Sequence, residues 1–184
     1  MPKNRAVGPT ITFLELEPSG WNALTSIILV LGLMDECGRA KVFTVGKPLD
    51  EKPIIARMLQ MSADWDLLVT WGGESKMPFI TSRALHNGLD PSRLHGVMQL
   101  DLKRYVREKM GLEVLSAEEL ATFLGLAGRR GSKRLDIMQR YQVLSGGRAA
   151  SLLKRRCVEE LGMVRRVFMR LRPMLRSTNP ELAL

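Results

Sequence analysis

Residues 11–17 read Ile11-Thr12-Phe13-Leu14-Glu15-Leu16-Glu17, an apolar, strand-like run that ends in two carboxylates. Side chains alternate between the two faces of a strand, so Ile11, Phe13, Glu15 and Glu17 point to one side. Two carboxylates about 7 Å apart on one side of a strand suit a divalent metal held between them. The alternative is a strand that frays into solvent at Pro18-Ser19-Gly20, with both glutamates hydrated.

The length and composition predict one folded domain. A chain of 184 residues suits a single substantial core. Hydrophobic residues make up 45% and charged residues 26%, which is typical of globular rather than disordered proteins. We expect residues 1–184 to form this domain, with flexible tails at 1–9 and 174–184. The longest apolar stretch, residues 27–33, is shorter than the roughly 20 residues that span a bilayer, so we expect no membrane association.

The cysteines and the N-terminal residues favour the cytosol. Cys37 and Cys157 lie far apart and form no CxxC or Cys/His group, which argues against a zinc site or a disulfide framework. The basic N-terminus is not followed by an apolar signal-peptide core. We expect a cytoplasmic protein with two structural thiols.

Positive charge is concentrated in the last third of the chain. The net charge is +9, and residues 129–176 hold 14 Lys and Arg against three acidic residues. Such a surface typically binds phosphates, because their neutralisation releases counterions. The alternative is a basic proteome or an ion-pair-rich thermophilic protein, although this segment offers few acids for pairing.

The apolar pattern predicts three antiparallel strands followed by crossover units. Residues 10–17, 25–34 and 40–45 have strand composition and are separated by turn signals. A helix over 49–61, a buried strand over 66–71, a helix over 78–87 and a strand over 96–102 follow. The remainder reads helical: 102–110, a helix begun by Ser116, and 148–172, ended by Pro173. This order is that of the α/β ribonuclease H-like fold, a mixed five-stranded sheet of three antiparallel and two parallel strands flanked by helices, with a helical C-terminal third.

Four segments within residues 10–172 resemble the motifs of the DEDD superfamily of 3'-5' exonucleases. They are residues 13–20 (FLELEPSG), 68–80 (LVTWGGESKMPFI), 95–102 (HGVMQLDL) and 152–161 (LLKRRCVEEL). The branch that they resemble contains the exonuclease domains of family-B DNA polymerases and their stand-alone relatives. Each motif alone is weakly specific, but the four occur in order and in the expected secondary structure.

The resemblance implies a catalytic site at these segments, with several substitutions. The corresponding positions are Glu15, Glu17, Lys76, Asp101 and Glu160. Glu15 and Glu160 stand where the family has Asp, and Lys76 occupies the position of a catalytic Asp. In this superfamily two Mg²⁺ or Mn²⁺ ions bridge four carboxylates, so the implied metal ligands are Glu15, Glu17 and Glu160, if any metal is bound. The residue that orients water in the family, a Tyr or a His, is replaced by Arg156 or Arg155.

The predicted helix 148–172 has an apolar side and a basic side. At 100° per residue, one apolar stripe contains Leu153, Cys157, Leu161, Val164, Phe168 and Leu171. Glu160 falls inside this stripe, where a carboxylate has to be paired, hydrogen-bonded or bound to a cation. The opposite side carries Arg148, Arg155, Arg166 and Arg170, which form either a phosphate-facing stripe or an ordinary solvated face. The residues that we expect to bind nucleic acid are Arg148, Lys154, Arg155, Arg156, Arg166 and Arg170. Trp21, Trp71 and Tyr105 are possible base-stacking platforms, although each also suits the core.

The substitutions lead to one hypothesis and two alternatives. The hypothesis is an exonuclease-like domain that has lost or greatly weakened two-metal catalysis, binds nucleic acid or a nucleoprotein partner, and uses Lys76 as an internal counter-ion for the glutamates. The first alternative is an active 3'-5' exonuclease in which Glu15, Glu17 and Glu160, with Asp101 or Glu74, hold one Mg²⁺ or Mn²⁺. The second is a structural subunit that docks on an acidic protein, on ribosomal RNA, or in a replication, repair or ribonucleoprotein complex.

Overall fold

A mixed five-stranded sheet forms the centre of the computed structural model, which describes residues 8–47, 50–114, 116–126 and 148–178. Its strands are β1 (Ile11–Pro18), β2 (Ile28–Asp35), β3 (Ala40–Thr44), β4 (Leu67–Thr70) and β5 (Met98–Asp101). The order across the sheet is β3-β2-β1-β4-β5. Strands β1, β2 and β3 pair antiparallel, whereas β1 with β4 and β4 with β5 pair parallel. The sheet predicted from the sequence is confirmed.

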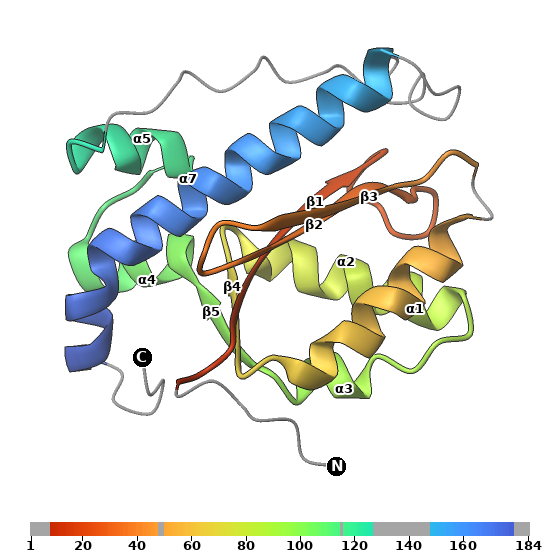
Figure 1. The fold of residues 1–184 in the computed structure, drawn as a ribbon, viewed down its shortest axis with the longest axis horizontal. Helices are drawn as coiled ribbons and strands as arrows, with labels where there is room; N and C mark the ends of the chain where they lie inside the picture. The colour runs from red at the N-terminus through yellow and green to blue at the C-terminus, as the bar shows by residue number, and fades with distance from the viewer. Residues whose placement is uncertain (1–7, 48–49, 115, 127–147, 179–184) are drawn as a thin grey trace.

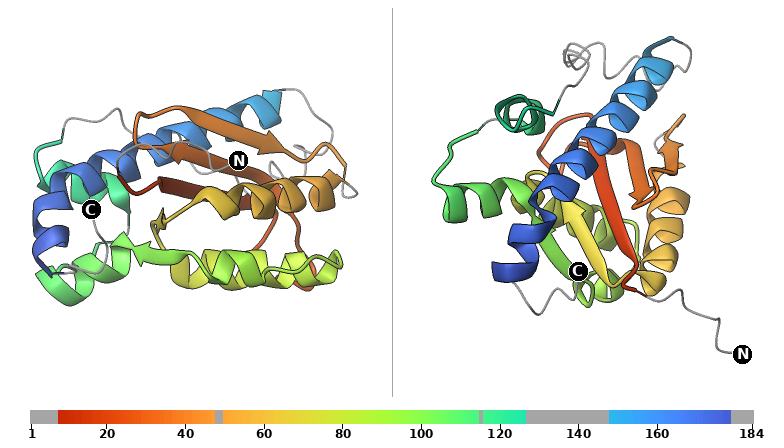
Figure 2. Two further views of the ribbon diagram at one scale, coloured as in Figure 1. Left: turned by 60° about the horizontal axis from the view of Figure 1, so that its bottom comes forward. Right: turned by 60° about the vertical axis from the view of Figure 1, so that its left-hand side comes forward.

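Helices cover both faces of this sheet (Figure 1). One side carries α1 (Glu51–Met61), the short η2 (Ser62–Asp64), α2 (Gly73–His86) and α3 (Ser92–His95). The other side carries α4 (Leu102–Met110), α5 (Ala117–Phe123) and the long α7 (Arg148–Thr178), which crosses the sheet diagonally. Figure 2 shows α7 and α1 on opposite sides of β1. No helix within the described ranges is long and apolar enough to cross a membrane.

Strand β1 is buried along its whole length because it lies in the middle of the sheet, between two cores. Phe13 faces α7 and packs edge-on against Phe168, with ring centroids 5.3 Å apart. Leu14 and Leu16 point to the opposite core, beneath α1 and α2. Glu15 and Glu17 are each only 4% exposed. The alternative of a frayed strand end with hydrated glutamates is therefore wrong.

Helix α2 begins five residues before the predicted start at Pro78. Asp101, at the end of β5, accepts hydrogen bonds from the backbone N–H of Gly72 (2.9 Å) and of Glu74 (3.2 Å). These bonds satisfy donors at the start of the helix that have no partner within it. Gly72 adopts a left-handed conformation with φ of 74°, which glycine reaches without a steric penalty. The earlier start includes Lys76 in the helix.

Helix α7 continues through Pro173 to Thr178, so the prediction that Pro173 ends it is wrong. Leu175 is fully buried in the core on this side of the sheet, and the hydroxyls of Tyr105 and Thr178 lie 2.7 Å apart. This tertiary packing stabilises the last turns beyond the proline. Residues 174–178 are thus helical rather than a tail. Residues 1–7 and 179–184 of the predicted tails lie outside the described residues.

Candidate functional site

A buried ion pair between Glu15 and Lys76 connects β1 to α2. The Lys76 Nζ lies 2.6 Å from the Glu15 Oε1, and the two side chains are 8% and 5% exposed. The same Glu15 oxygen accepts a hydrogen bond from the backbone N–H of Leu16 at 3.1 Å. Glu15 faces α7 because it shares the side of β1 that carries Phe13. The counter-ion expected from the position of Lys76 is present in the fold.

Arg156 joins the other two glutamates. Its Nε lies 3.2 Å from the Glu17 Oε1, and its Nη2 lies 2.7 Å from the Glu160 Oε1. Its Nε also donates to Glu160 at 2.8 Å. Arg156 is 6% exposed, whereas Glu160 is half-buried. The structure therefore positions Arg156 inside, beside Glu17 and Glu160, and not among the exposed side chains that could bind nucleic acid.

Burial sets the protonation chemistry of this cluster. Loss of hydration raises the pKa of Glu15 to about 7, while the Lys76 ammonium opposes the rise and the Glu160 carboxylate adds to it. Cys157 lies one residue beyond Arg156, and its pKa is raised well above the usual value by burial and by the three glutamates. Its thiol therefore remains protonated and unreactive at neutral pH.

The Asp101 carboxylate accepts hydrogen bonds from backbone N–H groups and is not part of the ion-pair cluster of Glu15, Glu17 and Glu160. Besides the N–H groups of Gly72 and Glu74, its carboxylate accepts from the N–H of Lys103 at 3.0 Å and so caps α4. The side chain consequently fastens the ends of β4 and β5 to the helices that follow them. This role suits its position at a strand end followed directly by a helix.

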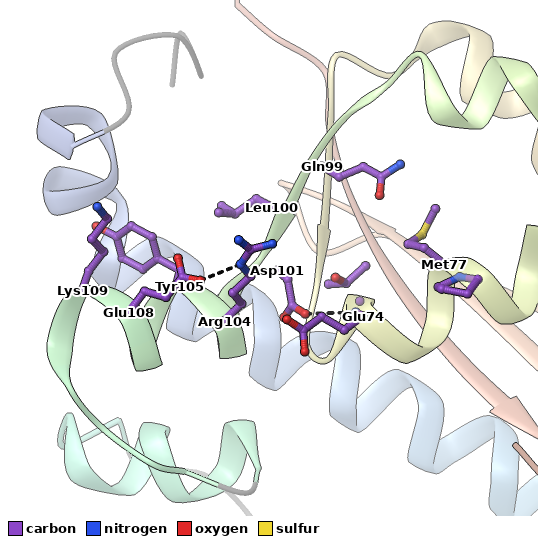
Figure 3. Close-up of a pocket in the computed structure, with 12 residues that line it drawn as sticks. Glu74, Met77, Gln99, Leu100, Asp101, Arg104, Tyr105, Glu108 and Lys109 are labelled. Atoms are coloured by element: carbon purple, nitrogen blue, oxygen red, sulfur yellow. Dashed lines mark hydrogen bonds and ion pairs between the residues drawn. The ribbon is translucent and has the colours of Figure 1, made fainter.

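A separate groove of about 410 Å³ lies between α2, β5 and α4 (Figure 3). Its lining includes Glu74, Gln99, Asp101, Arg104 and Tyr105, but not Glu15, Glu17 or Glu160. Arg104 pairs with Glu108 at 2.7 Å on its rim. No sequence signal indicated this groove, because its walls come from segments that are distant along the chain.

The other predicted nucleic-acid-binding residues lie on the surface of α7. Arg148, Lys154, Arg155, Arg166 and Arg170 are all exposed, on a helix whose predicted apolar stripe is fully buried. Arg155 lies 3.8 Å from Glu159, and Arg166 contacts the sulfur of Met163. Within the described ranges, no carboxylate pairs with Arg148, Arg166 or Arg170. Among the three aromatic candidates, Trp21 is 52% exposed and Trp71 and Tyr105 are buried.

Several solved structures share this architecture. The family B DNA polymerase of the hyperthermophilic archaeon Pyrobaculum calidifontis matches 95% of this chain and 26% of its own length, with a TM-score of 0.76 and 16% identity. E. coli exonuclease I in complex with a dT13 oligonucleotide matches 92% of this chain and 43% of its own, with a TM-score of 0.53 and 12% identity. The chain has the fold of the 3'-5' exonucleases. The Nibbler EXO domain of Aedes aegypti shares this exonuclease fold over 93% of the chain and 81% of its own length, with a TM-score of 0.53 and 13% identity.

The resemblance read from the four motifs is thus confirmed in the fold. The chain spans about a quarter of the polymerase and less than half of exonuclease I. Neither a protein-family model nor a curated protein sequence matches it.

The side chains at the carboxylate site do not fit the pair of divalent metals that this exonuclease fold implies. Glu15 already holds the Lys76 ammonium, and Glu17 and Glu160 share the Arg156 guanidinium. A metal at either place would have to displace a cation at ion-pair distance. In the described part of the chain, no three His, Cys, Asp or Glu side chains are arranged to hold a metal ion.

Sequence reasoning did not predict the ion pairs of Arg156 with Glu160 and Glu17. Arg156 and Glu160 are four residues apart on one helix, which places them side by side on its surface. That spacing was a readable signal for their pairing. The pairing of Arg156 with Glu17 had no such signal, because it depends on how α7 lies across β1.

Proposed function

We propose that this is a cytosolic nucleic-acid-binding protein that uses the 3'-5' exonuclease fold without efficient two-metal catalysis. The observation that carries the proposal is the distance of 2.6 Å between the Lys76 Nζ and the Glu15 carboxylate. An ammonium group here satisfies the charge of a carboxylate that would otherwise be available to a metal. It does not deliver a metal-bound water for attack on a phosphodiester.

The chemistry of the neighbouring positions supports the same proposal. Two-metal phosphodiester cleavage depends on near-octahedral oxygen ligands and on alignment that a shift of about 1 Å degrades. Glutamate at positions 15 and 160 carries one methylene more than the aspartate of the family pattern. Arg156, which stands where the family has its water-orienting tyrosine, is bound to Glu17 and Glu160.

Support for nucleic-acid binding comes from the surface of α7. Six basic side chains are exposed on it, and five of them have no carboxylate partner in the described part of the chain: Arg148, Lys154, Arg166, Arg170 and Arg176. Such residues contact phosphates without reading bases, so the affinity depends steeply on salt. E. coli exonuclease I, which shares the fold, is described with a dT13 oligonucleotide.

A nuclease assay on the purified full chain tests the proposal. The substrates are 3'-labelled single-stranded and duplex DNA and RNA, incubated with Mg²⁺ or Mn²⁺, beside the Glu17→Gln variant. We expect binding of nucleic acid and no shortening from the 3' end beyond that seen with the variant. Metal-dependent shortening that Glu17→Gln abolishes would establish the active exonuclease instead, with Mg²⁺ or Mn²⁺ as its cofactor.

The outward direction of the basic residues favours a second candidate, a structural subunit of a replication, repair or ribonucleoprotein complex. Arg155 and Arg166 are exposed, whereas Lys76 and Arg156 are buried at the carboxylate site. A subunit of this kind would bind through α7 alone. Affinity that survives exchange of the Glu15–Lys76 charges but collapses when Arg155 and Arg166 are neutralised would favour this candidate.

A further inference from the structure

The carboxylate site is nearly neutralised by the protein itself. Three glutamates, two from β1 and one from α7, meet one lysine from α2 and one arginine from α7. The charges sum to one negative unit when all five groups are ionised. Lys76 and Arg156 are each 6% exposed, so both cations belong to the interior.

A buried carboxylate requires a counter-charge, and this requirement can be met by a metal or by a side chain. In this cluster each glutamate is already within 3.2 Å of a side-chain nitrogen. Water screens poorly at a site of this kind, so a divalent ion would be repelled strongly by an ammonium or guanidinium group beside it. A metal could bind only after one of these cations had moved away from its glutamate.

We propose that Lys76 and Arg156 are built-in counter-ions that exclude divalent metals from the carboxylate site, and that their joint removal exposes a metal site made by Glu15, Glu17 and Glu160. This inference deepens the proposed function, since it assigns the loss of two-metal chemistry to two particular residues. Each has its own glutamates: Lys76 holds Glu15, and Arg156 holds Glu17 and Glu160. Replacing one of them therefore leaves the other in place, and both have to change.

Direct titration of the full chain with Mn²⁺ tests this inference without any substrate. Free Mn²⁺ is measured by electron paramagnetic resonance, and thermal unfolding is followed with Mn²⁺ or with EDTA. We expect the natural sequence to bind no Mn²⁺ at millimolar concentration and to unfold at the same temperature in both conditions. Saturable binding of Mn²⁺ that Glu17→Gln removes would overturn the inference. This experiment does not depend on whether variants of Lys76 and Arg156 are stable.

The second arm uses Lys76→Asp combined with Arg156→Tyr. We expect this double variant to bind Mn²⁺ at least tenfold more tightly than the natural sequence and to unfold at a higher temperature with Mn²⁺ than with EDTA. Adding Glu17→Gln should remove both effects. The matched control is Lys76→Asp with Arg155→Tyr, which changes an exposed arginine next to Arg156 and should not gain the site.

If the first double variant does not fold, the test uses a milder pair, Lys76→Gln with Arg156→Gln. This pair removes both charges with little change of size. Absence of Mn²⁺ binding in a folded double variant would overturn the inference, because the glutamates would then lack metal affinity of their own. The proposed function fails separately, through metal-dependent cleavage by the natural sequence. Metal binding by the natural sequence, without cleavage, would overturn only the inference about the two counter-ions.

Discussion

The Lys76 ammonium and the Glu15 carboxylate form an ion pair of 2.6 Å at which both side chains are almost fully buried. The pair connects the central strand to the helix on the opposite face of the sheet from α7. Burying two charges is unfavourable unless each compensates the other. Whichever partner is removed, the other loses its counter-charge inside the protein, so it has to stay charged at a cost or become neutral.

Lys76→Met should therefore destabilise the fold strongly. We expect the free energy of unfolding, measured by urea denaturation, to fall by about 3 to 5 kcal/mol. Lys76→Met combined with Glu15→Gln should recover part of this loss, since no charge is then left alone. The control is Arg104→Met in the exposed pair with Glu108, where we expect less than about 1 kcal/mol. Equal effects of the two single substitutions would contradict the assignment.

The raised pKa of Glu15 predicts a dependence of stability on pH. Its pKa is about 7 in the folded protein against the ordinary 4.5 of a glutamate side chain. Between these values the folded state holds a proton that the unfolded state has released. This contribution to stability is therefore complete below about pH 4.5 and is lost as the pH rises through 7. The loss in unfolding free energy is about 2 to 4 kcal/mol, because a difference of one pKa unit corresponds to about 1.36 kcal/mol.

Glu15→Gln removes this titration. The difference in unfolding free energy between the natural sequence and Glu15→Gln should consequently change between pH 5 and pH 8, as measured by urea denaturation across this range. Glu113→Gln, at an exposed position, is the control and should show a constant difference. A constant difference for Glu15→Gln as well would refute the raised pKa.

Gly32 in β2 permits the close approach of α7 to the sheet. A Cβ atom at this position would overlap the Cys157 sulfur and lie 2.8 Å from the Leu161 Cδ1. We expect Gly32→Ala to lower the unfolding free energy by about 1 to 3 kcal/mol, through overpacking. Adding Cys157→Ala should recover part of the loss, because the two positions are in contact.

Gly96→Ala is the matched control for this substitution. Gly96 has φ of −76°, and a Cβ there would meet only ordinary contacts, the nearest at 3.5 Å. Its effect on unfolding by urea should be small. A loss at Gly96 as large as that at Gly32 would argue against the steric explanation.

The two cysteines should differ sharply in reactivity. Cys37 is exposed, whereas Cys157 is buried beside three glutamates that help to raise its pKa. Treatment of the folded protein with iodoacetamide at pH 8 should modify Cys37 and leave Cys157 unmodified, as read by mass spectrometry of peptides. In denaturant both should react. Modification of Cys157 in the native protein at the rate of Cys37 would show that the site opens readily.

Arg155 and Arg166 should contribute to nucleic-acid binding through phosphates. We expect Arg155→Gln with Arg166→Gln to weaken binding to all sequences and to reduce the slope of log affinity against log salt by about 1 for each lost contact. Fluorescence anisotropy with a labelled oligonucleotide measures both quantities. Lys52→Gln with Arg57→Gln removes the same net charge from α1, on the other side of the sheet, and should change the slope little.

Local patterns in the sequence predicted which side chains of β1 and α7 are buried. The alternation in residues 11–17 predicted that Glu15 and Glu17 share a face with Phe13, and the structure buries all three. The 3.6-residue period of α7 predicted its buried stripe, from Leu153 to Leu171. These patterns are readable because the side-chain directions of a strand or a helix follow from spacing alone.

Two features of the molecule depend on contacts between distant segments rather than on local preference. Pro173 is a strong local signal to end a helix, yet the burial of Leu175 and the contact of Thr178 with Tyr105 sustain α7 beyond it. Asp101, which the sequence predicted as a site residue, accepts hydrogen bonds from the backbone N–H groups of Gly72, Glu74 and Lys103. Neither outcome could be read without knowing which segments pack together.

The sequence by itself determined the order of the elements, the shared face of Glu15 and Glu17, and the presence of a lysine where a carboxylate was expected. Only the tertiary structure decided that Lys76 reaches Glu15 and that Arg156 turns inward to Glu17 and Glu160. The physical reason is that an ion pair depends on distance in space and on burial. Both are set by the packing of β1, α2 and α7, which no short stretch of sequence encodes.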